Sequence, residues 1–173
     1  MLEVECIVNG ILEENCYIIH DNKNALIVDP GSQGIKIINK INELKVSVKA
    51  ILITHYHFDH TGALEEMKNH YNVDVIDFEN KKNNSGFEFK IIENFGHTLD
   101  SVSYLFEKDK IMFTGDFVFK DSIGKYDEEN EYIMFESLKN FTKLDDNIVI
   151  YPGHGPSSTV GYEKRYNYFL RGM

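Results

Sequence analysis

The sequence predicts an α+β fold in which two β-sheets pack together and helices cover them. Strand-like runs fall in two blocks, and a helical pattern follows each block. The chain of 173 residues is long enough to bury a sizeable core. No repeat of fixed period and no low-complexity linker divides it, so we expect residues 1–173 to form one domain.

Short runs rich in β-formers alternate with turn signals in the first half of the chain. The expected strands of this half are Leu2–Val8, Asn15–Ile19, Ala25–Val28, Val48–Thr54 and Val73–Asp77. Apolar residues then recur at helical spacing between these runs. The expected helices are Gly34–Lys45 and a second one from Thr61 to about His70.

A polar stretch, Glu79–Gly86, separates the two blocks and is expected to be an exposed loop. The expected strands of the second half are Phe87–Ile92, Ser101–Phe106, Lys110–Thr114 and Asn147–Tyr151. Helical spacing predicts Glu131–Leu144 and a closing helix, Gly161–Leu170.

Composition excludes several classes of function. The formal net charge of −10 argues against a nucleic-acid surface, because phosphate binding needs clustered Lys and Arg. No apolar run approaches membrane-spanning length, and the N-terminus carries acids where a secretory leader carries bases. We therefore expect a cytoplasmic protein with no membrane partner, in which Cys6 and Cys16 are buried free thiols.

The most informative segment is Thr54–His60, with the pattern T-H-x-H-x-D-H. In an extended loop, residues two apart point the same way, so His55 and His57 can converge on one ion. Asp59 and His60 follow at the start of a helix, where the turning chain can direct them to a neighbouring point. The segment therefore predicts a metal site.

Three further candidate ligands follow predicted strands: His97, Asp116 and His154, each beside a glycine. Imidazole and carboxylate ligands without thiolate suit zinc, iron or manganese. Any one of these histidines alone could cap a helix or satisfy a buried polar group. Burying the whole set without a metal would be unfavourable, so we interpret it as one centre. His20 and His70 are expected to be structural.

These motifs closely resemble the metallo-β-lactamase superfamily, and within it the glyoxalase II-like hydrolases of the short bacterial branch. The resemblance runs nearly end to end. It is carried by Ala25–Gly31, the T-H-x-H-x-D-H run, Gly96–Thr98, Thr114–Asp116 and Pro152–Pro156. It implies a four-layer αββα sandwich.

The resemblance also implies a binuclear centre. By position, His55, His57 and His97 hold one ion, Asp59, His60 and His154 hold the other, and Asp116 bridges them. The two divalent ions are expected to be Zn²⁺ first, with Fe²⁺ or Mn²⁺ as alternatives. A metal-bridged hydroxide attacks an ester or thioester carbonyl, since metal binding lowers the pKa of water to about 7. Asp59 and Asp116 are the catalytic carboxylates, and Asp29 is a structural neighbour of the ligands.

The substrate implied is a small acyl-thiol such as S-lactoylglutathione. Lys125 matches a family lysine that contacts the glutathione carboxylate, and Tyr126 is expected to assist it. The chain departs from the family pattern at two places, one beside Lys125 and one in the turn after His97. Asp127 stands where the family has a tyrosine, and His97 is followed by Thr98-Leu99-Asp100 in place of Thr-Pro-Gly.

Two other functions remain open at this point. One is a mononuclear iron oxygenase resembling persulfide dioxygenases, which use two His and one Asp of the same scaffold. The other is a non-catalytic metal-binding protein. In each case we expect a monomer or a small homo-oligomer.

Overall fold

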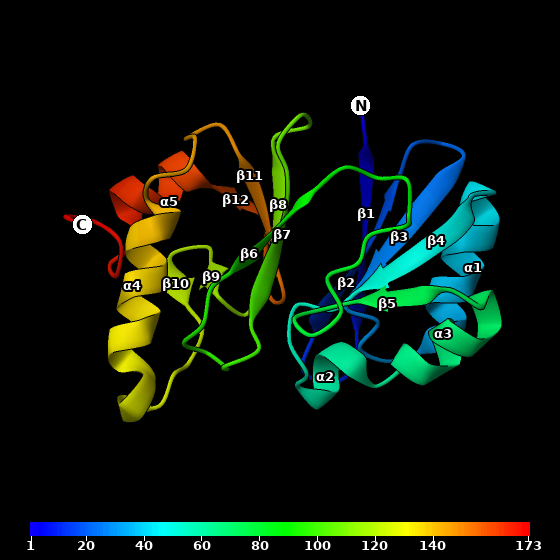
Figure 1. Cartoon of the computed structure of the whole chain (residues 1–173), viewed down its shortest axis with the longest axis horizontal. Coiled ribbons are helices and arrows are strands. Elements are labelled where there is room, and N and C mark those ends of the chain that lie inside the picture. The colour runs from blue at the N-terminus through cyan, green and yellow to red at the C-terminus, as the bar shows by residue number, and fades with distance from the viewer. The chain divides into compact units, whose positions relative to one another are not determined.

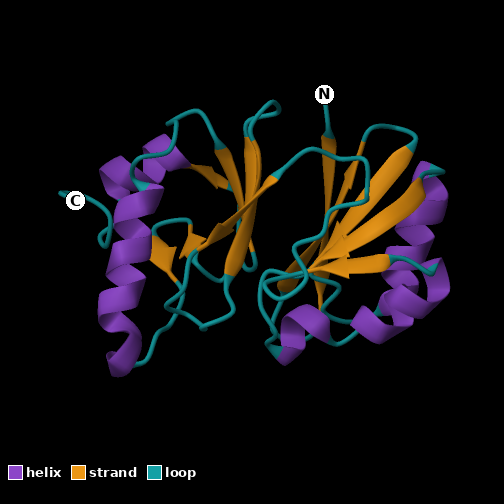
Figure 2. Ribbon diagram, in the orientation of Figure 1, coloured by secondary structure: helices purple, strands orange, loops and turns teal.

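The computed structural model describes residues 1–173, which form two compact units: an N-terminal unit, Met1–Glu88, and a C-terminal unit, Phe89–Met173. Each unit contains one five-stranded sheet and its helices, and the C-terminal unit also has a short two-stranded sheet (Figures 1 and 2). No helix has the length and apolar character needed to cross a membrane.

The sheet of the N-terminal unit has the order β1-β2-β3-β4-β5. Its strands are β1 Glu3–Asn9, β2 Glu14–His20, β3 Asn24–Val28, β4 Ser47–Leu52 and β5 Asp74–Ile76. β1, β2 and β3 are joined by antiparallel pairing, whereas β3, β4 and β5 are parallel. The carboxyl ends of β3 and β4 therefore lie at the same edge of the sheet.

Three helices belong to this unit: α1 Gly34–Leu44, α2 Phe58–Thr61 and α3 Leu64–Tyr71. Ile37 and Ile41 of α1 and Met67 of α3 pack with strand residues such as Ile18 and Ile51 in one hydrophobic core. Helix α1 is amphipathic as its spacing predicts, and it begins at the expected residue.

The sheet of the C-terminal unit has the order β12-β11-β8-β7-β6. Its strands are β6 Lys90–Glu93, β7 Val102–Phe106, β8 Ile111–Gly115, β11 Val149–Pro152 and β12 Ser158–Thr159. β11 pairs with β8 in parallel, and the other pairs are antiparallel. A separate hairpin contains β9 Val118–Phe119 and β10 Ser122–Ile123. The helical elements are a 3₁₀ turn, η1 Glu128–Asn130, and α4 Glu131–Phe141 and α5 Val160–Tyr166.

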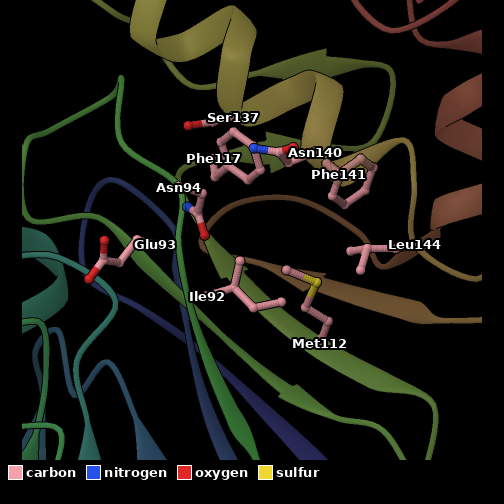
Figure 3. A pocket seen from close by; sticks show the side chains of 9 residues that line it. All are labelled: Ile92, Glu93, Asn94, Met112, Phe117, Ser137, Asn140, Phe141 and Leu144. Atoms are coloured by element: carbon pink, nitrogen blue, oxygen red, sulfur yellow. The ribbon is translucent and has the colours of Figure 1, made fainter.

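A small cavity of about 40 Å³ lies in the core of the C-terminal unit, between α4 and the sheet. Figure 3 shows Ile92 and Met112 on its sheet side and Phe117, Phe141 and Leu144 around it. A cavity of this size has room for a water molecule and not for a larger ligand.

The helix expected from Thr61 to about His70 was predicted to begin at the wrong residue. The chain already turns helical at Phe58, and α2 and α3 are separate helices. The Ala63 amide donates to the carbonyl of Pro30 at 2.9 Å instead of continuing the helical ladder. This contact with a distant segment interrupts the helix, and no local pattern could reveal it.

Other boundaries also differ from the expectations. β6 begins at Lys90 instead of Phe87, because pairing with β7 starts there. α5 ends at Tyr166 because Asn167 adopts an extended backbone. The two-residue strands β9, β10 and β12 are too short for periodicity to detect. Cys6 and Cys16 are free thiols, but Cys6 is exposed on the edge strand β1 and not buried as predicted.

Candidate metal centre

The candidate ligands fall into two clusters, one in each unit. The N-terminal cluster consists of His55, His57, Asp59 and His60, and the C-terminal cluster consists of His97, Asp116 and His154. In both units a pair of parallel strands ends beside the cluster. The carboxyl ends of parallel strands are the usual place for a binding site in such sheets.

In the N-terminal unit, β4 leads directly into the cluster. His55 Nε2 lies 3.0 Å from His57 Nδ1, and His60 Nε2 lies 3.8 Å from Asp59 Oδ2. His55 and His60 are almost completely buried, at 1% and 0% exposed. All four ligand-type side chains of this cluster thus come from one six-residue segment.

Asp29, which follows β3, supports this cluster. It accepts hydrogen bonds from the Thr54 amide at 2.8 Å and the Thr54 hydroxyl at 2.6 Å. Its Oδ2 also lies 2.9 Å from His60 Nδ1, and the other ring nitrogen of His60, Nε2, faces Asp59. Metal-binding histidines typically give their other ring nitrogen to a carboxylate in this way. The structure therefore places Asp29 as expected, behind a candidate ligand.

Two glycines allow the backbone to hold Asp59 in place. A Cβ at Gly31 would collide with the Asp59 carbonyl, and one at Gly62 would collide with the Gly31 carbonyl. The Asp29-Pro30-Gly31 turn and α2 can pack this closely only because both positions lack side chains.

In the C-terminal unit, Asp116 is the centre of the cluster. Its Oδ2 lies 3.6 Å from His97 Nε2 and 3.7 Å from His154 Nε2. Two ligands bound tetrahedrally to one zinc ion are about 3.4 Å apart. Both spacings therefore suit a carboxylate that shares a metal with each of the two histidines.

The C-terminal cluster is held by contacts between distant segments. His97 Nδ1 lies 2.5 Å from the Lys125 carbonyl oxygen, and its Nε2 is the nitrogen that faces Asp116. The Gly153 amide donates to the Gly115 carbonyl at 2.8 Å, which joins the chain before His154 to the chain before Asp116. A Cβ at Gly124 would collide with the Asp116 carbonyl, so this loop also needs a glycine.

A buried carboxylate, Glu163 of α5, holds the hairpin that follows Asp116 by hydrogen bonds. It accepts hydrogen bonds from the Asp121 amide at 3.0 Å and from Asn167 Nδ2 at 2.8 Å, and it is paired with the Ser158 hydroxyl. The ring of Phe119, in the same hairpin, contacts the His154 ring edge-on at 6.1 Å between centroids. Glu163 thus connects α5, β12 and the hairpin.

The sequence interpretation missed Glu163 and one more buried acid, Glu14. The carboxylate of Glu14 lies within 4.8 Å of the ligand-type atoms of Asp29 and His60, and all three residues are buried. A weak signal was available, since Glu14 lies in a run, ENCYIIH, that is otherwise mostly apolar. Glu163 lies in a helix with several charges and gives no such signal.

The two expected substrate residues differ in their surroundings. Lys125 has an exposed side chain, and its carbonyl contacts His97. Tyr126 is half-buried and packs edge-on against Phe135, in the core of the C-terminal unit. Its ring therefore has a packing role in this structure.

Comparison with known proteins identifies the family of this chain. The model of the metallo-beta-lactamase superfamily matches residues 9–82 and 73–154. Hydroxyacylglutathione hydrolase GloC of Haemophilus influenzae is 30% identical over an alignment 209 residues long. The alignment covers 98% of this chain and 98% of the relative.

Solved structures agree. The crystal structure of BLEG-1 B3 metallo-beta-lactamase matches with a TM-score of 0.91 and 27% identity, covering 98% of this chain and 100% of that one. The structure of TTHA1623 in a di-iron-bound form matches with a TM-score of 0.87 and 26% identity, covering 96% and 100%. The predicted α+β fold of the metallo-β-lactamase type is confirmed, and the chain belongs to the metallo-β-lactamase superfamily.

Proposed function

We propose that the chain is a binuclear metal-dependent hydrolase of small thioesters or esters, similar to hydroxyacylglutathione hydrolases. The observation that carries the proposal is a full set of seven imidazole and carboxylate ligands in a chain that matches such a hydrolase from end to end. Each cluster supplies part of the set.

The proposed assignment divides the ligands between two ions. His55, His57 and His97 bind the first, and Asp59, His60 and His154 bind the second, with Asp116 shared. The spacing of Asp116 from two histidines supports its role as the shared ligand. The absence of thiolate from the set suits zinc, with iron or manganese as alternatives.

The residues of this chain then have distinct tasks. Bound ions would supply an activated water at neutral pH and polarise the substrate carbonyl. Asp59, on the first turn of α2, orients the attacking water. Asp29 keeps His60 in the tautomer that binds metal through Nε2, since its carboxylate faces Nδ1. The exposed ammonium of Lys125 attracts a carboxylate on the thiol part of the substrate.

Metal analysis of the purified protein, combined with a panel of thioesters and lactones, tests the proposal. We expect about two transition-metal ions per chain, hydrolysis that a chelator abolishes, and recovery when Zn²⁺, Mn²⁺ or Fe²⁺ is restored. One iron per chain, with consumption of oxygen, would instead indicate the oxygenase. Metal binding without turnover of any member of the panel would indicate a non-catalytic protein.

A further inference from the structure

A pocket of about 240 Å³ opens in the N-terminal unit beside Asp59. One wall is the β1–β2 turn with Ile11 and Leu12, and the other is formed by Phe58 at the start of α2. The turn and α2 lie at the same end of this unit (Figure 1). The two close-packed glycines, Gly31 and Gly62, also line the pocket, together with Asn9, Gly10 and Ser32.

The lining of this pocket is almost entirely apolar. Ile11 is 96% exposed, Phe58 73% and Leu12 48%, although all three are large apolar residues. Scattered exposed apolar side chains are ordinary, but three that surround one pocket form a patch of the kind that marks a binding site. Their burial on binding would favour an apolar ligand.

Asn9 adds one polar feature. It lines the pocket, is only 1% exposed, and neither polar atom of its amide has a hydrogen-bond partner. A buried amide without a partner is unfavourable, so such a group is normally satisfied.

We propose that this pocket binds the acyl chain of the substrate, and that the enzyme prefers thioesters of apolar acyl groups several carbons long. The inference rests on the proposed function, because Asp59, which would orient the attacking water, lines this pocket, so the reacting carbonyl would lie at its mouth. The volume holds about eight groups the size of a water molecule, whose share of liquid volume is about 30 Å³. A two-carbon acyl group would leave most of this space unfilled.

The test uses acetyl, butyryl and hexanoyl thioesters of N-acetylcysteamine with the metal-loaded full chain. The thiol half is the same in all three, so only the acyl half varies. We expect kcat/KM to rise with length by up to about fourfold for each added methylene, as burial of a methylene implies. Hexanoate should likewise inhibit more strongly than acetate.

Two variants locate the effect. Leu12→Ser should flatten the dependence on chain length, because Leu12 forms a wall of the pocket. Val8→Ser is the matched control, since Val8 is 54% exposed on the same hairpin and does not line the pocket. It should keep the wild-type dependence.

The outcomes separate the two proposals. Hydrolysis of all three thioesters at similar kcat/KM would overturn the acyl pocket and leave the proposed function standing. A chain-length dependence that Leu12→Ser and Val8→Ser alter equally would also overturn it. Failure to hydrolyse any thioester would overturn the proposed function, and the acyl pocket with it.

Discussion

The two ligand clusters are built in different ways. The N-terminal cluster takes four candidate ligands from His55–His60, one short segment after β4. The C-terminal cluster takes three from separate loops, which follow β6, β8 and β11. Each cluster has one acidic support, but Asp29 contacts a ligand directly, whereas Glu163 acts through the hairpin after Asp116.

This difference indicates which cluster depends on tertiary structure. The order of residues alone keeps His55, His57, Asp59 and His60 near one another. Nothing local brings His97, Asp116 and His154 together, so their arrangement requires the folded sheet and α5. We therefore expect loosening of the C-terminal unit to weaken metal binding before the unit unfolds.

The largest effect is expected for Asp116→Asn. Asp116 is the only member of its cluster within ligand spacing of both other members, so its loss should weaken both ions. We expect hydrolysis to fall by more than about 100-fold and the metal content to fall toward one ion or none. Glu107→Gln, an exposed change of equal charge in the same unit, is the control for metal analysis and kinetics. Retention of two ions with full activity would refute the bridging role.

Asp29→Asn should have the next largest effect. Asn tolerates the left-handed backbone that Asp29 adopts at φ 48°, so the turn should survive. An amide has one acceptor oxygen, however, and cannot serve Thr54 and His60 as the carboxylate does. We expect metal affinity to fall by about 10–100-fold in competition with a chromophoric chelator. Asp74→Asn, exposed on β5, should leave the affinity unchanged.

Glu163 tests the indirect support of the C-terminal cluster. Glu163→Ala removes the acceptor for Asp121, Ser158 and Asn167, and should lower the free energy of unfolding by about 3 kcal/mol. We expect metal affinity to fall as well, by less than for Asp29→Asn, because no ligand is touched. Glu163→Gln keeps an acceptor at this position and should retain most of the free energy of unfolding and most of the metal affinity.

Chelator competition and urea unfolding of the two Glu163 variants provide the readout. A purely structural role would lower the unfolding free energy of Glu163→Ala without changing the metal affinity of the protein that remains folded. Equal loss of affinity in Glu163→Gln would show that the charge matters more than the hydrogen bonds.

The same difference explains how far the sequence alone could be interpreted. The pattern at His55–His60 is local and predicts a metal site directly. His97, Asp116 and His154 could be chosen because each follows a predicted strand and adjoins a glycine. The residues that support the clusters could not be predicted in this way. Glu163 and Asn167 lie in a segment with the composition of an ordinary surface helix, and they are buried only in the folded chain.

Boundaries of elements show the same limit. The core helix α1 was predicted because its apolar stripe is a property of its own residues. The break between α2 and α3 was not, because it depends on a hydrogen bond from Ala63 to Pro30, a residue distant in sequence. Features fixed by nearby residues could be predicted, and features fixed by contact with distant segments could not.

The smallest effect is expected on the surface of the C-terminal unit, at Asp145. Lys110 donates to its carboxylate at 2.6 Å and holds the pKa of Asp145 at about 2. An unfolded aspartate has a pKa near 3.9, so this contribution to stability is complete above about pH 4 and is lost as pH falls through about 2. Asp145→Asn should thus lower the urea midpoint slightly at pH 6, with the difference from wild type vanishing near pH 2. Metal affinity at neutral pH should not change, because Asp145 touches neither Glu163 nor a ligand. A fall in affinity as large as that of Glu163→Ala would mean that any weakening of this unit disturbs the cluster, and that Glu163 has no special positioning role.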